Sequence, residues 1–233
     1  GEGGMHVHVQ DGQVLDVRLR IFEPPRFFEA FLRGRAYTEP PDITARICGI
    51  CPVAYQMSAC QALEAACGVR VDDEIRALRH LLYCGEWIES HALHIHLLHA
   101  PDFLGYPSGL AMAADHRFEV ERGLALKKVG NRVVEVVGGR AVHPVNVRVG
   151  GFFSTPTMAS MRELAGDLRQ ALDDAVDVAR WVSTFPVPDH ELPDATALVA
   201  LRHPTEYPML GERLVSPGGL DIGVDEFGDH FAE

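Results

Sequence analysis

Basic side chains and long apolar stretches are both scarce in this chain. It has 21 lysine and arginine residues against 33 aspartate and glutamate residues, so its formal net charge at pH 7 is −12. A surface of that sign repels phosphate backbones, which argues against nucleic-acid binding. No apolar run approaches the ~20 residues needed to cross a bilayer. No cationic segment followed by an apolar one precedes the first strand pattern, so we expect a cytoplasmic protein without a membrane span.

Cysteine is also sparse, and its distribution is uneven. The five cysteines all lie between Cys48 and Cys84. A disulfide-stabilised secreted domain would use an even number of cysteines spread through its loops. The clustering therefore favours reduced thiols in a cytosolic protein, with a metal or redox function for the close pair Cys48 and Cys51.

Hydrophobic residues, at 47% of the chain, are sufficient for a sizeable core. Alternating valines on both sides of Asp11-Gly12 predict an antiparallel hairpin over 5–21. The remaining pattern predicts a mainly α fold with small antiparallel β pieces, in the α+β class. The expected helices cover 26–35, 52–67, 72–100, 108–129 and 158–185, with strand character over 131–152 and an irregular segment after Phe185.

The stretch TARICGICPVAYQMSAC contains a Cys-x-x-Cys pair, Cys48 and Cys51, directly before Pro52. Proline at a first helical position and Gly68 beyond the end predict a helix that starts after the pair. A helix N-terminus stabilises thiolate over thiol. Such a pair could belong to a zinc site or a redox dithiol. Cys60 and Cys67 do not form a second zinc knuckle, however, and no βαβ unit precedes the pair.

The residues on either side of the cysteine pair favour a more specific interpretation. ARICGICP resembles the N-terminal nickel-binding motif of the large subunit of nickel–iron hydrogenases. EGGMHVHVQDGQV resembles the opening hairpin of that family, RFFEAFLRGR its following helix, ESHALHIHLLHAPDFLG its histidine-rich helix, and VHPVNVRVGGF its His-Pro and Gly-Gly segment. The resemblance covers nearly the whole chain, in order, and is strongest to the cytosolic branch coupled to NAD(P).

The resemblance implies a set of metal ligands. Cys48 would be a terminal nickel ligand, and Cys51 would bridge nickel to an iron that carries CO and cyanide. Soft thiolates suit nickel and can bridge two metals, and a terminal thiolate is a candidate proton acceptor. Glu29 matches a ligand of a third, hard metal, magnesium or iron. Arg46 would orient the site, and Asp102 would lie above the metals.

Some family features are not found in the sequence. The family's second Cys-x-x-Cys is absent, and so is the glutamate that relays protons in the family. Glu2 lies next to the position of that glutamate and is not its equivalent. We therefore expect 1–233 to be the N-terminal part of a single large-subunit domain, cut at both ends and inactive alone. Tyr55 stands where many members have a histidine that hydrogen-bonds a cysteine sulfur.

Other polar residues have simpler explanations. His91, His94, His96 and His99 are expected to be hydrogen-bonded core residues, and Cys60, Cys67 and Cys84 to pack in apolar surroundings. The resemblance implies reversible H2 cleavage, with electrons passed first to an iron–sulfur small subunit, then to diaphorase-type subunits. Two alternatives stay open: a non-catalytic homologue of the quinone-reductase type, and a zinc or redox Cys-x-x-Cys protein.

Overall fold

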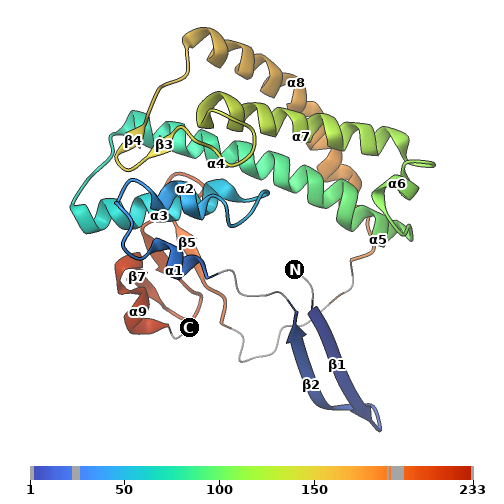
Figure 1. Cartoon of the computed structure of the whole chain (residues 1–233). Helices are drawn as coiled ribbons and strands as arrows, with labels where there is room; N and C mark the ends of the chain where they lie inside the picture. The colour runs from blue at the N-terminus through green and yellow to red at the C-terminus, as the bar shows by residue number, and fades with distance from the viewer. Residues whose placement is uncertain (1–2, 23–26, 188, 190–196, 232–233) are drawn as a thin grey trace. The chain divides into compact units, whose positions relative to one another are not determined.

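The structure is a computed structural model that describes residues 3–22, 27–187, 189 and 197–231. The chain forms two compact units, residues 1–35 and 36–233. Figure 1 shows their elements along the chain.

The first unit contains an antiparallel hairpin and a short helix. Strands β1 (Gly3–Gln10) and β2 (Gln13–Ile21) pair in a register that places Val7 opposite Val17. The tight turn needs a left-handed backbone, and Asp11 and Gly12 supply it with φ values of 50° and 76°. Helix α1 (Phe28–Leu32) follows. The predictions for both elements are confirmed.

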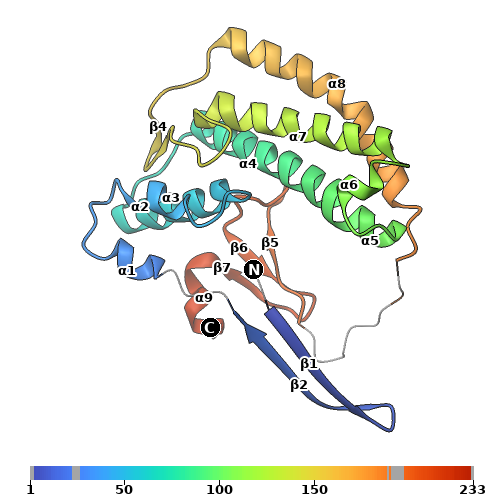
Figure 2. The same cartoon turned by 45° about the vertical axis from the view of Figure 1, so that its right-hand side comes forward.

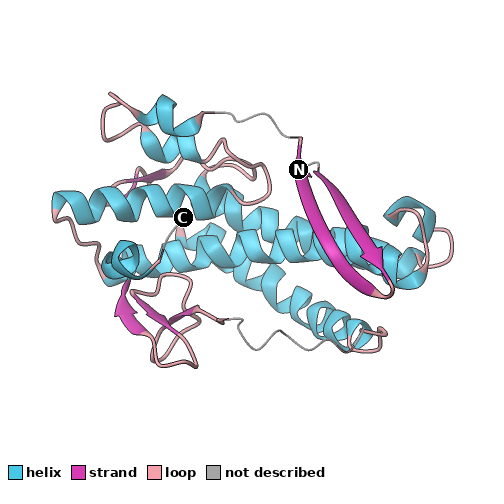
Figure 3. Cartoon of the chain, turned by 90° about the horizontal axis from the view of Figure 1, so that it is seen from below, coloured by secondary structure: helices cyan, strands magenta, loops and turns pink. Residues whose placement is uncertain are grey.

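The second unit is built around two long helices that lie side by side, α4 (Asp73–Leu93) and α7 (Arg117–Gly138), as Figures 1 and 2 show. Helix α8 (Met158–Val182) packs on α7, and α3 (Pro52–Cys67) packs on α4. Helices make up most of this unit (Figure 3). The shorter elements are α2 (Pro40–Thr44), the π-helix η1 (His94–His99), α5 (Ala100–Leu104), α6 (Gly109–Met112), the 3-10 helix η2 (Val224–Glu226) and α9 (Phe227–His230).

Small sheets complete the second unit. Strands β3 (Val147–Arg148) and β4 (Gly151–Phe152) form one antiparallel pair. Strands β5 (Ala200–Arg202), β6 (Arg213–Val215) and β7 (Asp221–Gly223) form an antiparallel sheet in that order. The predicted fold class, mainly α with small antiparallel β pieces, is confirmed.

Two glycines allow α4 and α7 to approach closely. A Cβ placed on Gly85 would lie 2.7 Å from the Val133 side chain, and one on Gly130 would lie 2.7 Å from the Gly85 carbonyl oxygen. Beside this contact lies the main core, which contains Val53, Met57, Leu82, Val134 and Phe152.

Several predicted boundaries were wrong. The long helix does not stop at Pro101, because proline is tolerated in the first turn of α5, which continues from η1. The helix predicted over 108–129 is two helices, α6 and α7. Residues 131–138 were expected to be strand but extend α7, because their valines pack on α4. The segment after Phe185 was expected to be irregular but contains β5, β6 and β7.

Candidate metal centre

The Cys-x-x-Cys pair lies on the loop between α2 and α3. Pro52 is the first residue of α3, and Cys51 is its N-cap, with φ −122° and ψ 39°. The Cys48 sulfur accepts a hydrogen bond from the Ile50 amide at 3.3 Å. Both cysteines are half-buried free thiols. The local sequence thus brings two sulfurs together at the start of a long helix.

The two thiols ionise unequally. Burial acts to raise the pKa of Cys48, but hydrogen bonds from the Cys51 thiol and from the Ile50 and Cys51 amides outweigh it, so the pKa of Cys48 is lowered. Burial, the bond to Cys48 and the charge on Cys48 raise the pKa of Cys51 to about 12. The pair therefore ionises first at Cys48, and the Cys51 thiol stabilises that thiolate.

A buried carboxylate lies beneath this loop. Glu86 of α4 is 2% exposed and accepts hydrogen bonds from the amides of Val53 at 2.5 Å and Ala54 at 3.3 Å. Burial raises the pKa of Glu86 to about 7, against the effect of those two bonds. This residue was not predicted from the sequence. An acidic residue within a helix expected to be buried was the signal that could have identified it.

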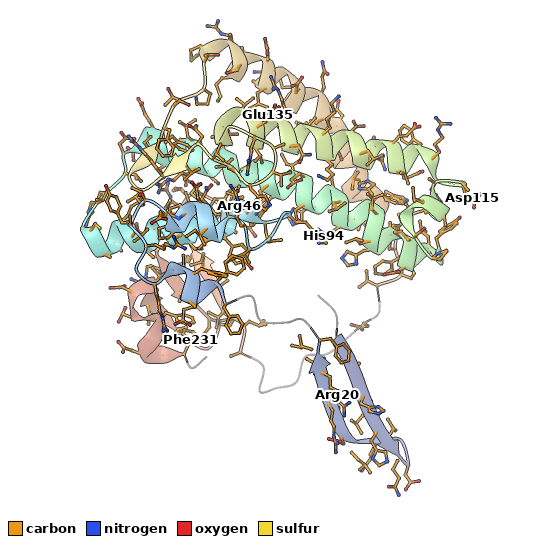
Figure 4. The ribbon with its side chains drawn as sticks, viewed as in Figure 1. Arg20, Arg46, His94, Asp115, Glu135 and Phe231 are labelled. Carbon is orange, nitrogen blue, oxygen red and sulfur yellow. The ribbon has the colours of Figure 1, made fainter. Side chains whose placement is uncertain are left out.

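A second segment holds the loop from the other side. The His143 ring donates from Nδ1 to the Ala45 carbonyl oxygen at 2.6 Å, and Gln56 donates from Nε2 to the Pro144 carbonyl oxygen at 2.9 Å. Arg46, which is exposed, contacts the His143 carbonyl oxygen at 3.5 Å. Figure 4 shows Arg46 beside the ribbon of α2 and α3. This placement next to the cysteines is compatible with its predicted orienting role, which stays a prediction.

Glu29 and Asp102 are the other predicted site residues. Glu29 is exposed on α1 in the first unit, where its carboxylate accepts a bond from Arg33 at 2.6 Å. Asp102 is exposed on α5. At 1.5 Å of rise per residue it lies roughly 24 Å along the helical path from Glu86. The structure therefore does not bring Asp102 to the cysteine pair, and the roles of Glu29 and Asp102 stay predictions.

The histidine-rich segment is only partly buried. His96 is fully buried and bonds the Ala92 carbonyl oxygen through Nδ1 at 3.0 Å, and its burial lowers its pKa. His94 is half-buried and bonds the Ser90 carbonyl oxygen at 2.6 Å (Figure 4). The expectation of core histidines is wrong for His91 and His99, which are exposed. Cysteine packing was also expected for three residues. Cys60 is buried and Cys84 is half-buried, but the expectation is wrong for Cys67, which is exposed.

The donor chemistry at the loop suits a soft metal. Two adjacent thiols, one of them readily ionised, are the type of ligand that nickel and bridging metals take. Within the part of the chain that the structure describes, no group of three or more His, Cys, Asp or Glu residues could hold a metal ion. The described residues therefore supply two thiols of a possible metal site and not a complete ligand set.

Comparison with known proteins identifies the family of this chain. The family model for nickel-dependent hydrogenases matches residues 26–121, a range that includes both cysteines and Glu86. The alpha chain of sulfhydrogenase 2 from Pyrococcus furiosus is 41% identical over 165 residues, which is 71% of this chain and 40% of the relative. This chain belongs to the nickel-dependent hydrogenase family.

Other members of the nickel-dependent hydrogenase family give the same result. The alpha chain of coenzyme F420 hydrogenase from Methanocaldococcus jannaschii is 34% identical over 181 residues, 73% of this chain and 42% of the relative. The crystal structure of an NAD+-reducing nickel–iron hydrogenase in the H2-reduced state superposes with a TM-score of 0.76 at 27% identity. The match covers 95% of this chain and 53% of that one. This chain thus spans about 40% of the length of these curated relatives.

Among the described residues, no helix has the length and apolar character needed to cross a membrane.

Proposed function

We propose that this chain is part of the hydrogen-activating large subunit of a nickel–iron hydrogenase, which cleaves H2 reversibly to two protons and two electrons. The observation that carries the proposal is the pair of free, half-buried thiols of Cys48 and Cys51 directly before α3. The pair lies inside the region that the family model matches.

The two cysteines of this chain would have different roles at the metal centre. Cys48 and Cys51 would hold the metals, Cys48 as a terminal ligand and Cys51 as a bridging one, with two further thiolates supplied from outside the described residues. When bound, the nickel–iron centre, with CO and cyanide on iron, supplies the polarisation of H2 and accepts its electrons. As a terminal thiolate, Cys48 would also take up a proton.

Electron transfer requires a partner. Within the described residues, no group of three or more His, Cys, Asp or Glu side chains could hold a metal, so this part of the chain offers no iron–sulfur cluster site. We propose that electrons leave through an iron–sulfur small subunit. Similarity to an NAD+-reducing hydrogenase supports a soluble acceptor such as NAD(P), reached through diaphorase-type subunits. Glu29 would bind magnesium or iron as a third metal, and Arg46 would orient the site.

Metal analysis of the intact gene product, purified without oxygen, tests this function. We expect nickel and iron to copurify with the chain and H2-dependent reduction of a redox dye. Zinc in place of nickel would support the zinc or redox Cys-x-x-Cys protein instead. Absence of metal and of dye reduction would support a non-catalytic homologue of the quinone-reductase type.

The 233-residue chain alone is the matched comparison. Its described residues bring two thiolates to the site, which is too few for a stable four-thiolate centre. We therefore expect this chain to retain no nickel–iron centre and to take up no hydrogen. Hydrogen-dependent dye reduction by the 233 residues would contradict this expectation.

A further inference from the structure

The start of α3 is capped in an unusual way. The first amides of a helix have no partner inside it, and the side chain of the N-cap residue normally accepts a hydrogen bond from one of them. Here the N-cap is Cys51, whose side chain makes no such bond. Pro52 has no amide hydrogen, so Val53 and Ala54 carry the first amides that need an acceptor.

Glu86 accepts from both of those amides. Its Oε2 lies 2.5 Å from the Val53 nitrogen and its Oε1 lies 3.3 Å from the Ala54 nitrogen. The carboxylate comes from α4, a different helix, and is 2% exposed. A charged acceptor at a helix N-terminus is also favoured by the helix dipole. Glu86 thus does what an N-cap side chain usually does.

An external cap has a consequence for the sulfur of Cys51. If Cys51 capped its own helix, its sulfur would turn toward the amides of Val53 or Ala54. Because Glu86 occupies those amides, the Cys51 sulfur is left free of its own helix. The groups that interact electrostatically with Glu86 are Cys48 and Cys51 from the loop, with Tyr83 and Glu89 from its own helix.

We infer that Glu86 is a positioning residue of the metal centre: by capping α3 from α4, it keeps the Cys51 sulfur beside that of Cys48 and free to bind metal. This inference rests on the proposed function, because it assigns Glu86 a role in building that same ligand pair. Glu86 itself is not assigned to the metals or to H2.

Site-resolved alkylation of the 233-residue chain tests the inference without any metal. The chain is treated with iodoacetamide at pH 8, and modification of each cysteine is measured by peptide mass spectrometry. In the unmodified sequence we expect Cys48 to react more than about tenfold faster than Cys51, because thiolate is the reactive form. Cys60, which is fully buried, reports whether the fold is intact.

Three variants separate positioning from general stability. E86A removes the cap, so Cys51 turns to its own helix and the Cys48 preference falls to within about threefold. E86Q retains an acceptor for Val53 and restores the preference. The matched control is E89Q, which changes another buried carboxylate of α4, 6% exposed and paired with Lys127 at 2.8 Å. It should leave the preference unchanged.

The outcomes are decisive in each direction. An unchanged Cys48 preference in E86A, with Cys60 still protected, overturns the inference. If E86A exposes Cys60, the variant E86D tests the inference instead, because aspartate keeps the charge but is too short to reach the amides of both Val53 and Ala54. Loss of the preference in E86D supports the inference, and its retention overturns it. Failure of the proposed function would instead appear as missing nickel in the intact gene product with this thiol pattern preserved.

Discussion

Both carboxylate oxygens of Glu64 accept hydrogen bonds from the Arg79 guanidinium, at 2.9 and 2.6 Å, inside the second unit. Glu64 is 6% exposed and Arg79 is 2% exposed, so solvent screens the pair little. Glu64 also accepts from the Gly150 amide at 2.7 Å. The ion pair therefore links α3, α4 and the loop between β3 and β4.

Removing one member of this pair should be costly. E64A leaves the Arg79 charge buried without its partner, so we expect the free energy of unfolding to fall by about 3–5 kcal/mol. Urea denaturation measures this change. The control E121A removes the exposed partner of Arg117 on α7 and should leave the free energy of unfolding almost unchanged. Equal effects of the two substitutions would contradict the importance of burial.

Two glycines, one at the contact between α4 and α7 and one on α8, are expected to respond in opposite ways to substitution by alanine. In G130A the new Cβ would lie 2.7 Å from the Gly85 carbonyl oxygen and closer still to the Glu89 amide, both rigid backbone atoms. We expect a loss of roughly 1–3 kcal/mol from overpacking. Gly166 on α8 has open space around its Cβ position, so G166A should stabilise by up to about 1 kcal/mol. Thermal denaturation of both variants measures the difference, and a stabilising G130A would contradict the close approach.

Glu86 predicts a particular pH dependence of stability. Burial raises its folded-state pKa from the ordinary 4.5 to about 7. Between those values the folded state binds more protons than the unfolded state, so this contribution to stability is full below about pH 4.5 and is lost as the pH rises through 7. We expect the stability of the unmodified chain relative to E86Q to fall by at most about 3 kcal/mol between pH 4 and pH 8. Parallel denaturation profiles for the two proteins would disprove the shift.

Local signals in the sequence explain which elements could be predicted. The hairpin follows from Asp11-Gly12, and α3 follows from Pro52 at its start and Gly68 at its end, where φ is 66°. Both are decided by residues next to each other in the chain. The adjacent cysteines before Pro52 were predictable for the same reason.

Tertiary contacts explain what the sequence did not reveal. The valines of 131–138 have high strand propensity, but packing of Val133, Val134 and Val137 makes them helical. Glu86 acts on a loop more than 30 positions earlier in the chain, so no local pattern connects it to Cys51. His143, with a left-handed φ of 51°, likewise reaches Ala45 across the fold.

The cysteine pair makes a last prediction, on the metal content of the intact gene product. C48S or C51S replaces a soft thiolate with a hard hydroxyl that binds nickel poorly. We expect either substitution to lower the bound nickel more than about tenfold, as measured by elemental analysis. Cys67 provides the matched control, because it is an exposed thiol on the same helix, at the end away from the pair. C67S should retain full nickel content, and equal nickel in C48S and C67S would exclude Cys48 as a ligand.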